Sequence, residues 1–79
     1  MVNTNKIVEL LRESLPPVFS RKTAERTLGG IISARTLANL DSQKRGPARK
    51  YISNTVCYER ETFLSWLADR LSDQPGRPL

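Results

Sequence analysis

The chain has 79 residues, 38% of them hydrophobic and 27% charged, a balance typical of one small folded domain rather than of a disordered segment. It has no histidine and one cysteine, Cys57, which excludes an internal disulfide, a zinc finger and a histidine general base. No apolar run approaches the roughly 20 residues that cross a bilayer, and the net charge is +5. We therefore expect a packed thiol at Cys57 and a reducing, cytoplasmic setting.

Positive charge is concentrated in the middle of the chain. Residues 20–60 hold nine of the thirteen lysines and arginines but only three of the eight acidic residues. Such a concentration on a small domain favours a polyanionic partner, of which nucleic acid is the commonest. The alternative is a solvated basic surface whose only effect is on solubility.

The first predicted element is a helix at about 4–15. Its apolar side chains recur at helical spacing and share one stripe: Ile7, Val8, Leu10, Leu11 and Leu15. Glu9 and Glu13 fall within this stretch, so it is not typical of a signal peptide. The proline pair at 16–17 ends the helix, because proline cannot continue it.

Two short helices are predicted next, at about 20–29 and 33–42. Ser20 and Ser33 stand at their N-cap positions, where a serine hydroxyl accepts a hydrogen bond from a backbone N–H of the first turn. The glycine pair at 29–30 ends the first of these helices, because glycine adopts the left-handed cap conformation without steric cost. The sequence therefore predicts two helices joined by a short turn.

The turn and the second of these helices divide into inward and outward residues. Ile31 and Ile32 are expected to cross the core, and Leu37 and Leu40 form the inward row of the helix. In a helix-turn-helix, the second helix enters the major groove of DNA, with polar residues of its N-terminal half facing the base edges. The candidates for that position are Ser33, Arg35, Thr36 and Asn39.

A basic turn and a hairpin follow. Lys-Arg-Gly-Pro at 44–47 predicts the turn, and two β-prone segments predict a hairpin at about 50–58 with Ser53 and Asn54 at its tip. Strands this short are marginal alone and must pack against helices. A hairpin directly after a helix-turn-helix forms a wing, and the cations beside it are candidates for phosphate contact: Lys44, Arg45, Arg49 and Lys50.

The last predicted helix spans about 60–71, and residues 73–79 are expected to form a flexible tail. The apolar side chains of this helix lie at core spacing: Phe63, Leu64, Leu67 and Leu71, with Trp66 at the flank. Phe63 and Trp66 are therefore interpreted as core aromatics rather than as a platform on which bases stack. Residues 1–72 are expected to make one domain.

An ordered set of motifs runs through the chain: Leu-Gly-Gly at 28–30, Arg-Thr-Leu-Ala-Asn at 35–39, Gly-Pro at 46–47, Val-x-Tyr at 56–58 and Phe-Leu-x-Trp-Leu at 63–67. In this order they resemble the small helix-turn-helix proteins of phages and bacteria, namely the excisionase-like and AlpA-like proteins with a MerR-type winged fold. The resemblance covers about residues 18–70. It implies a mostly α, winged helix-turn-helix domain with a small β-hairpin that binds double-stranded DNA in a sequence-specific manner.

The resemblance also implies a role and partners. Proteins of this kind act as recombination directionality factors or as transcriptional regulators, so we expect an excisionase-like phage or prophage protein or a small regulator. The resemblance implies that the protein partners are a phage integrase or further copies of the chain on DNA. It also implies a location in the cytoplasm, on the nucleoid. It places the 33–42 helix in the major groove and the 53–54 turn near the DNA backbone or the minor groove.

Arg21 and Lys22 are further candidate contacts. Both stand at the start of a helix, where the helix dipole favours acids over cations, so their placement indicates phosphate contact. An enzyme is not expected, because the sequence lacks histidine, a glycine-rich phosphate loop followed by Lys-Ser/Thr, and a metal-ligand cluster. No cofactor, metal, small-molecule substrate or membrane partner is expected either.

Two alternatives to duplex-DNA binding stay open. The first is a small basic protein–protein adaptor that meets an acidic partner and reads no DNA; salt-sensitive retention on DNA would separate the two, because phosphate contacts release counterions. The second is RNA binding. The lack of aromatic side chains expected to be exposed among the cations argues against recognition of single strands.

Overall fold

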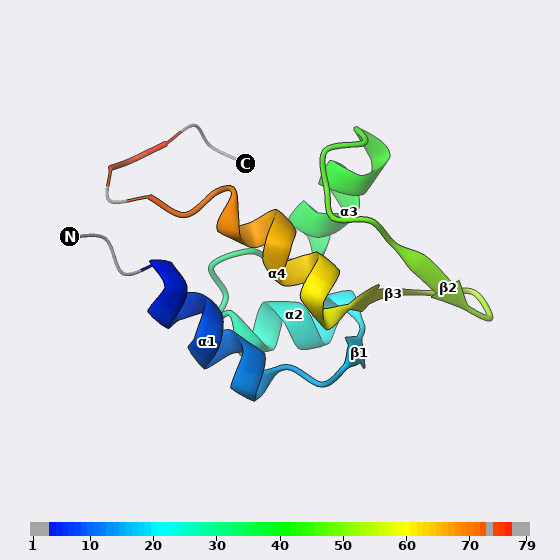
Figure 1. Cartoon of the computed structure of the whole chain (residues 1–79). Helices are drawn as coiled ribbons and strands as arrows, with labels where there is room; N and C mark the ends of the chain where they lie inside the picture. Colours follow the sequence, from blue (N-terminus) through cyan, green and yellow to red (C-terminus); the bar gives the residue numbers. More distant parts are fainter. Residues whose placement is uncertain (1–3, 73, 77–79) are drawn as a thin grey trace.

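The computed structural model of the protein describes residues 4–72 and 74–76. Within them, four helices and a three-stranded antiparallel sheet form one small, mostly helical body (Figure 1). The helices are α1 (Thr4–Ser14), α2 (Arg21–Thr27), α3 (Ala34–Ser42) and α4 (Arg60–Ala68), and the strands are β1 (Val18–Phe19), β2 (Lys50–Ile52) and β3 (Thr55–Glu59). The prediction of a mostly α domain with a small β-hairpin is confirmed. No helix in the described part of the chain has the length and apolar content needed to cross a membrane.

Strand β3 is the centre of the sheet and joins the hairpin to the rest of the molecule. It pairs with β2 across the predicted turn, where Ile52 lies opposite Thr55, and with β1 on its other edge, where Phe19 lies opposite Tyr58. β1 was not predicted, because it is two residues long and no alternation of polar and apolar residues indicates it. Its pairing with the end of β3 anchors the hairpin at its base.

The core is built around four aromatic rings. The centroid of the Phe63 ring lies 5.1 Å from that of Phe19 and 5.6 Å from that of Tyr58, and Trp66 lies 5.7 Å from Phe63. Aromatic pairs of this kind each contribute roughly 0.5–1.5 kcal/mol beyond the burial of their area. Buried aliphatic side chains surround them: Leu15, Ala24, Leu28, Ile32, Leu37, Leu64 and Leu67. Trp66 is only partly buried, and Cys57 is buried as predicted.

The turn between α2 and α3 differs from the prediction. Ile31 was expected in the core but is 82% exposed, whereas Ile32 is buried. The reason is backbone geometry: Gly29 and Gly30 adopt φ angles of 67° and 83°, in the left-handed region that favours glycine. They turn the chain so that one of the two isoleucines points inward and the other points to solvent.

The two outer helices also bury less than their sequence patterns predicted. Ile7 and Leu10 of α1 are 46% and 54% exposed, because α1 packs against α4 with a narrower face than its five-residue stripe offers. Helix α4, predicted to reach residue 71, ends at Ala68. Beyond it, Arg70 and Leu71 donate backbone hydrogen bonds three residues back, the geometry of a tighter final turn.

Each of the three helices after α1 begins at a capping side chain. The Ser20 and Ser33 hydroxyls accept from the backbone N–H three residues further on, at 3.2 Å and 3.0 Å. At α4 the cap is Glu59, whose carboxylate accepts from the N–H groups of Glu61 and Thr62 at 2.7 Å and 3.0 Å. These hydrogen bonds stabilise the ionised carboxylate and hold the pKa of Glu59 below its usual range.

A buried carboxylate joins α2, α3 and β3. Asp41, 4% exposed near the end of α3, accepts hydrogen bonds on Oδ2 from Arg21 Nη2 and from Tyr58 Oη, each 2.7 Å long. Arg21 Nε also donates to Tyr58 Oη at 3.2 Å. We call these three side chains the Arg21–Asp41–Tyr58 triad. They fix the placement of one helix against another and of both against the sheet.

The ionisation of Tyr58 gives a direct test of the triad. Burial, followed by the hydrogen bond to Asp41, raises the pKa of Tyr58 from 10.0 to about 12. The folded state therefore holds the phenol proton more tightly than the unfolded state, so this group stabilises the fold below pH 10 and the stabilisation is lost as the pH rises toward 12. In a Tyr51→Phe variant, which keeps Tyr58 as its one tyrosine, tyrosinate absorbance should develop near pH 12; development near pH 10 would contradict the triad.

Gly46 should tolerate no side chain. A Cβ at this position would overlap Asp41 Oδ1 and lie 3.3 Å from Asp41 Cγ, and the carboxylate cannot move away without loosening its bonds to Arg21 and Tyr58. Gly46→Ala should lower the free energy of unfolding by about 1–3 kcal/mol, the usual effect of overpacking, as measured by urea denaturation. Gly76→Ala is the matched control, because a Cβ there meets nothing within 4 Å. Equal effects of the two substitutions would show that the Asp41 contact is not tight.

Candidate nucleic-acid interface

Helix α2 holds the start of α3 through a side chain that the sequence analysis did not single out. Glu25 Oε1 accepts a hydrogen bond from the backbone N–H of Ala34 at 2.9 Å. A carboxylate at a helix N-terminus satisfies one of the free N–H groups and complements the helix dipole. Together with the Arg21–Asp41–Tyr58 triad near the other end of α3, it fixes this helix at both ends.

The four candidate base-contacting residues of α3 fall into two pairs. Ser33 and Thr36 are engaged in the helix cap: Ser33 Oγ accepts from the Thr36 N–H and donates to Thr36 Oγ1 at 2.9 Å. Arg35 and Asn39 are exposed, and their side chains make no hydrogen bond or ion pair with the described residues. Being four residues apart, they lie on the same face of α3, one turn from each other. The free polar groups of this helix are therefore an arginine and an asparagine.

Arg21 is occupied within the fold. Its side chain is 25% exposed and its guanidinium donates to both Asp41 and Tyr58. Burial lowers its pKa, but the hydrogen bonds to these two partners outweigh that effect and raise it overall. The structure thus gives Arg21 a structural role, whereas its neighbour Lys22 is exposed and lies beside Arg26 at the edge of a shallow hollow on α2.

The base of the hairpin is tied to the end of α3. Arg49 Nη1 donates to the backbone carbonyl of Asp41 at 3.3 Å, and Arg49 Nε donates to Tyr51 Oη at 3.2 Å. Lys44, at a φ angle of 60°, lines the same open hollow of about 440 Å³ as Arg49 and Tyr51. Lys50 follows directly and is exposed. Two of the predicted wing cations, Lys44 and Arg49, are thereby brought to one hollow beside the end of α3, whereas Lys50 is not among the residues that line it.

The fourth wing cation, Arg45, is anchored through its backbone. Its carbonyl accepts from Trp66 Nε1 at 2.9 Å and from Arg70 Nη2 at 3.0 Å, while its side chain donates to Gln43. This contact joins the loop after α3 to α4. Arg45 is among the residues that line a groove near the end of α4, and it does not line the hollow that holds Lys44 and Arg49.

The tip of the hairpin is exposed, with Ser53 at a φ angle of 55° in the turn. Tyr51 and Ile52 just before it are also exposed. No aromatic side chain was expected to be exposed among the cations, an expectation that disfavoured recognition of single strands; the exposed Tyr51 contradicts it. Figure 1 shows the hairpin and α3 on the side of the molecule opposite to α1.

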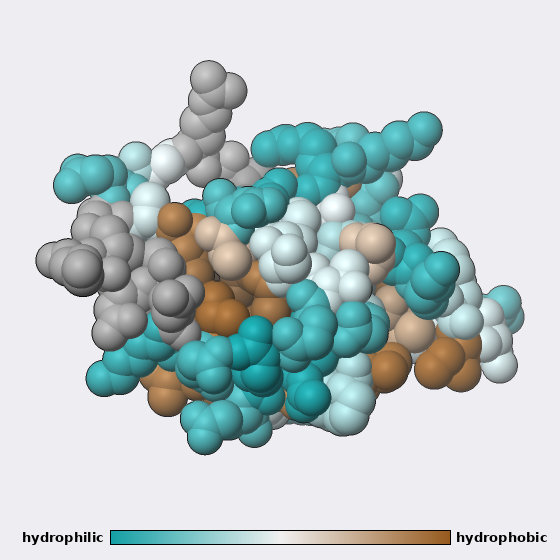
Figure 2. All heavy atoms as spheres, in the orientation of Figure 1, coloured by the Kyte–Doolittle hydropathy of each residue, from teal (hydrophilic) through white to brown (hydrophobic). Residues whose placement is uncertain are grey.

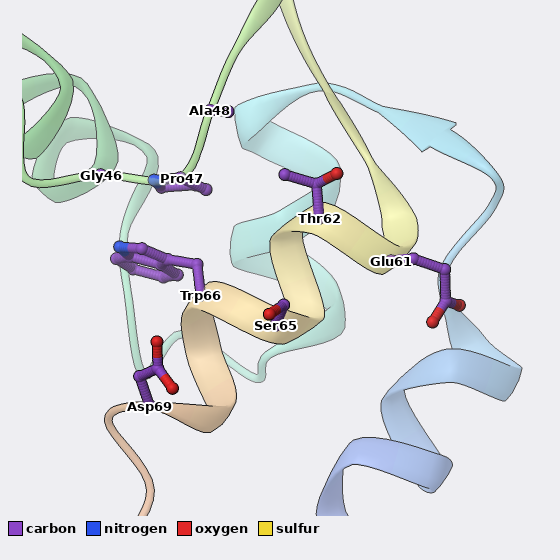
Figure 3. Close-up of a pocket in the computed structure, with 8 residues that line it drawn as sticks. All are labelled: Gly46, Pro47, Ala48, Glu61, Thr62, Ser65, Trp66 and Asp69. Atoms are coloured by element: carbon purple, nitrogen blue, oxygen red, sulfur yellow. The ribbon is translucent and has the colours of Figure 1, made fainter.

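A second open hollow, of about 530 Å³, lies between α4 and the segment leading into the hairpin. In Figure 3, Pro47 faces the Trp66 ring, and Glu61 and Ser65 follow one another along α4, with Asp69 directly after its last residue. Glu61 is paired with Arg12, which lowers the pKa of Glu61. The lining of this hollow includes acidic side chains and no lysine or arginine, although it adjoins the hollow of Lys44 and Arg49 through the shared residues 46–48.

The residues that the sequence analysis missed are those that position others. Asp41 follows Leu37 by four residues, so it falls on the inward face of α3. This spacing is the one feature of the sequence that indicates burial of Asp41, and a buried acid requires a partner. Glu25 carried no signal, because its partner is a backbone group. Comparisons with protein-family models, curated proteins and solved structures give no match.

Proposed function

We propose that the chain binds double-stranded DNA as a winged helix-turn-helix domain. In this assignment α2 and α3 are the helix-turn-helix, α3 is the recognition helix, and the β2–β3 hairpin is the wing. The observation that carries the proposal is the unpaired state of Arg35 and Asn39 on the outer face of a helix that is held at both ends. Fixed, exposed and chemically free groups of this kind are what base recognition requires.

The chemistry of these two side chains matches base edges. An α-helix with its side chains is about 10–12 Å across and the major groove is about 12 Å wide, so a helix fits it. The arginine fork pairs with O6 and N7 of guanine, and the asparagine amide pairs with N6 and N7 of adenine. Ser33 and Thr36, whose hydroxyls bond each other in the cap, serve to hold the helix start.

The cations at the hairpin are suited to phosphate contact. Lys44 and Lys50 are exposed and make no ion pair with the described residues. Arg49 is held against the Asp41 carbonyl and Tyr51, so less conformational freedom is lost when it meets a phosphate. Ser53 and Asn54 form the tip of the same hairpin, so they would contact the DNA backbone next to these cations. The proposal leaves out Arg21, whose guanidinium is engaged in the triad.

The biological role follows the resemblance of the motifs. The proposal therefore includes a role in excision directionality or in transcriptional regulation. It also includes a phage integrase or further copies of the chain as protein partners, and a place on the nucleoid. An adaptor for an acidic protein is the other class of function that the same cations fit. The two functions can be told apart by DNA binding: the affinity of a winged helix-turn-helix domain for DNA depends on base sequence, and that of an adaptor does not.

The division of labour between α3 and the hairpin can be measured. Selection from random duplexes supplies a preferred sequence, and affinity is then measured for this duplex and a scrambled one at two salt concentrations. Arg35→Ala should lose about 1–3 kcal/mol on the preferred duplex and relax the preference at one base pair. Lys50→Ala should weaken both duplexes alike and lower the slope of log affinity against log salt by about one, because phosphates are the same in every sequence.

Arg35→Lys is the matched control, because it keeps the charge but not the fork. It should leave the salt slope near that of the wild type, roughly −4 to −5 for about five phosphate contacts, and lose the preference. Uniform loss in Arg35→Ala without a change in preference would refute the recognition-helix assignment. Binding that ignores salt, or tighter binding to single strands stacked on Tyr51, would refute duplex recognition itself.

A further inference from the structure

A groove of about 680 Å³ lies where the α2–α3 turn meets the end of α4. Its apolar lining comes from Ile31, Ile32, Leu67 and Leu71. Ile31 has the highest exposure, 82%, of the large apolar side chains that the structure describes. An isoleucine held in water beside three other apolar side chains offers area that a partner would cover favourably.

Three charged residues line the groove, the cations Arg45 and Arg70 and the acid Asp69, so its lining has a net positive charge. Arg70 stacks over the Trp66 ring at 4.3 Å and donates to the carbonyls of Trp66 and Arg45. Arg45 donates to the Gln43 amide oxygen. Neither arginine forms an ion pair with a carboxylate among the described residues. A partner that fits this groove therefore combines an apolar ridge with a carboxylate.

Helix α1 of this chain presents that combination. Ile7 and Leu10 are about half exposed and stand three residues apart, on one edge of the helix. Glu13 stands three residues further along the same edge, is exposed, and has no ion-pair partner among the described residues. Figure 2 shows hydrophobic atoms at the surface on the left of the view, where α1 and the end of α4 lie in Figure 1.

We propose that this groove docks the Ile7–Leu10–Glu13 edge of α1 from a second copy of the chain. Ile7 and Leu10 would cover Ile31 and Leu71, and the Glu13 carboxylate would lie near the two arginines. Figure 1 shows α1 on the side of the molecule away from the hairpin, and the groove is lined by residues of the α2–α3 turn, by Arg45 and by the end of α4 and the segment after it. The proposal is independent of DNA binding and is tested without DNA.

Sedimentation of the full chain tests the proposal with two variants that each remove one surface. Leu10→Asp spoils the α1 edge and Ile31→Asp spoils the groove; both positions are exposed, and circular dichroism checks that each variant is folded. Measurements extend to roughly 1 mM, because small interfaces are weak. The weight-average mass of the wild type should rise with protein concentration. Each variant alone should associate at least about tenfold more weakly than the wild type.

The decisive sample is an equimolar mixture of the two variants. Each supplies the surface that the other lacks, so the mixture should associate more strongly than either variant alone. Glu13→Lys should weaken association through charge alone. Ile52→Asp is the control that should leave it unchanged, because Ile52 is also an exposed isoleucine, 65% against 82% for Ile31, but lies on the hairpin. A wild type that stays monomeric throughout, or a mixture that associates no better than its components, overturns the proposal.

Discussion

The fold depends on one buried carboxylate. Asp41 accepts from Arg21 and Tyr58 on one oxygen, while its backbone carbonyl accepts from Arg49, so a single residue connects α2, α3, the central strand and the base of the hairpin. Removing one partner of such a buried pair commonly costs about 3–5 kcal/mol, against a total stability of about 5–15 kcal/mol for a small domain. The hairpin and α3 consequently hold a fixed position relative to each other. A surface assembled from both can then meet a ligand without rearrangement.

The cations of the chain divide according to whether the fold uses them. Arg12, Arg21 and Arg60 are paired with acids and hold elements together, whereas Arg35, Lys44 and Lys50 are exposed without such partners among the described residues. The first group raises stability, and the second group is part of the uncompensated positive surface, to which Lys22, Arg45 and Arg70 also belong. The proposed function places DNA contact on α3 and the hairpin, a choice that net charge alone does not make because it counts both groups alike.

Sequence reasoning reached the helices and the hairpin, since apolar spacing, serine caps and a two-residue turn are local signals. It could not reach β1, whose two residues form a strand only because β3 lies beside them. It also placed Ile31 in the core, because the apolar pattern does not reveal which way two glycines turn the chain. At the candidate site it found Arg35 and Asn39. It could not separate Arg21 from Lys22, since only tertiary structure shows that one guanidinium meets a buried carboxylate.

The proposed function requires that α3 and the hairpin together form one surface for duplex DNA. Backbone amide chemical shifts during titration with a duplex test this requirement, because each residue reports separately. The largest changes should occur at residues 35–39 and 44–55, with the amides of α1 and of the end of α4 unaffected. Changes centred on α1 and α4, or changes on the hairpin without any on α3, would contradict it.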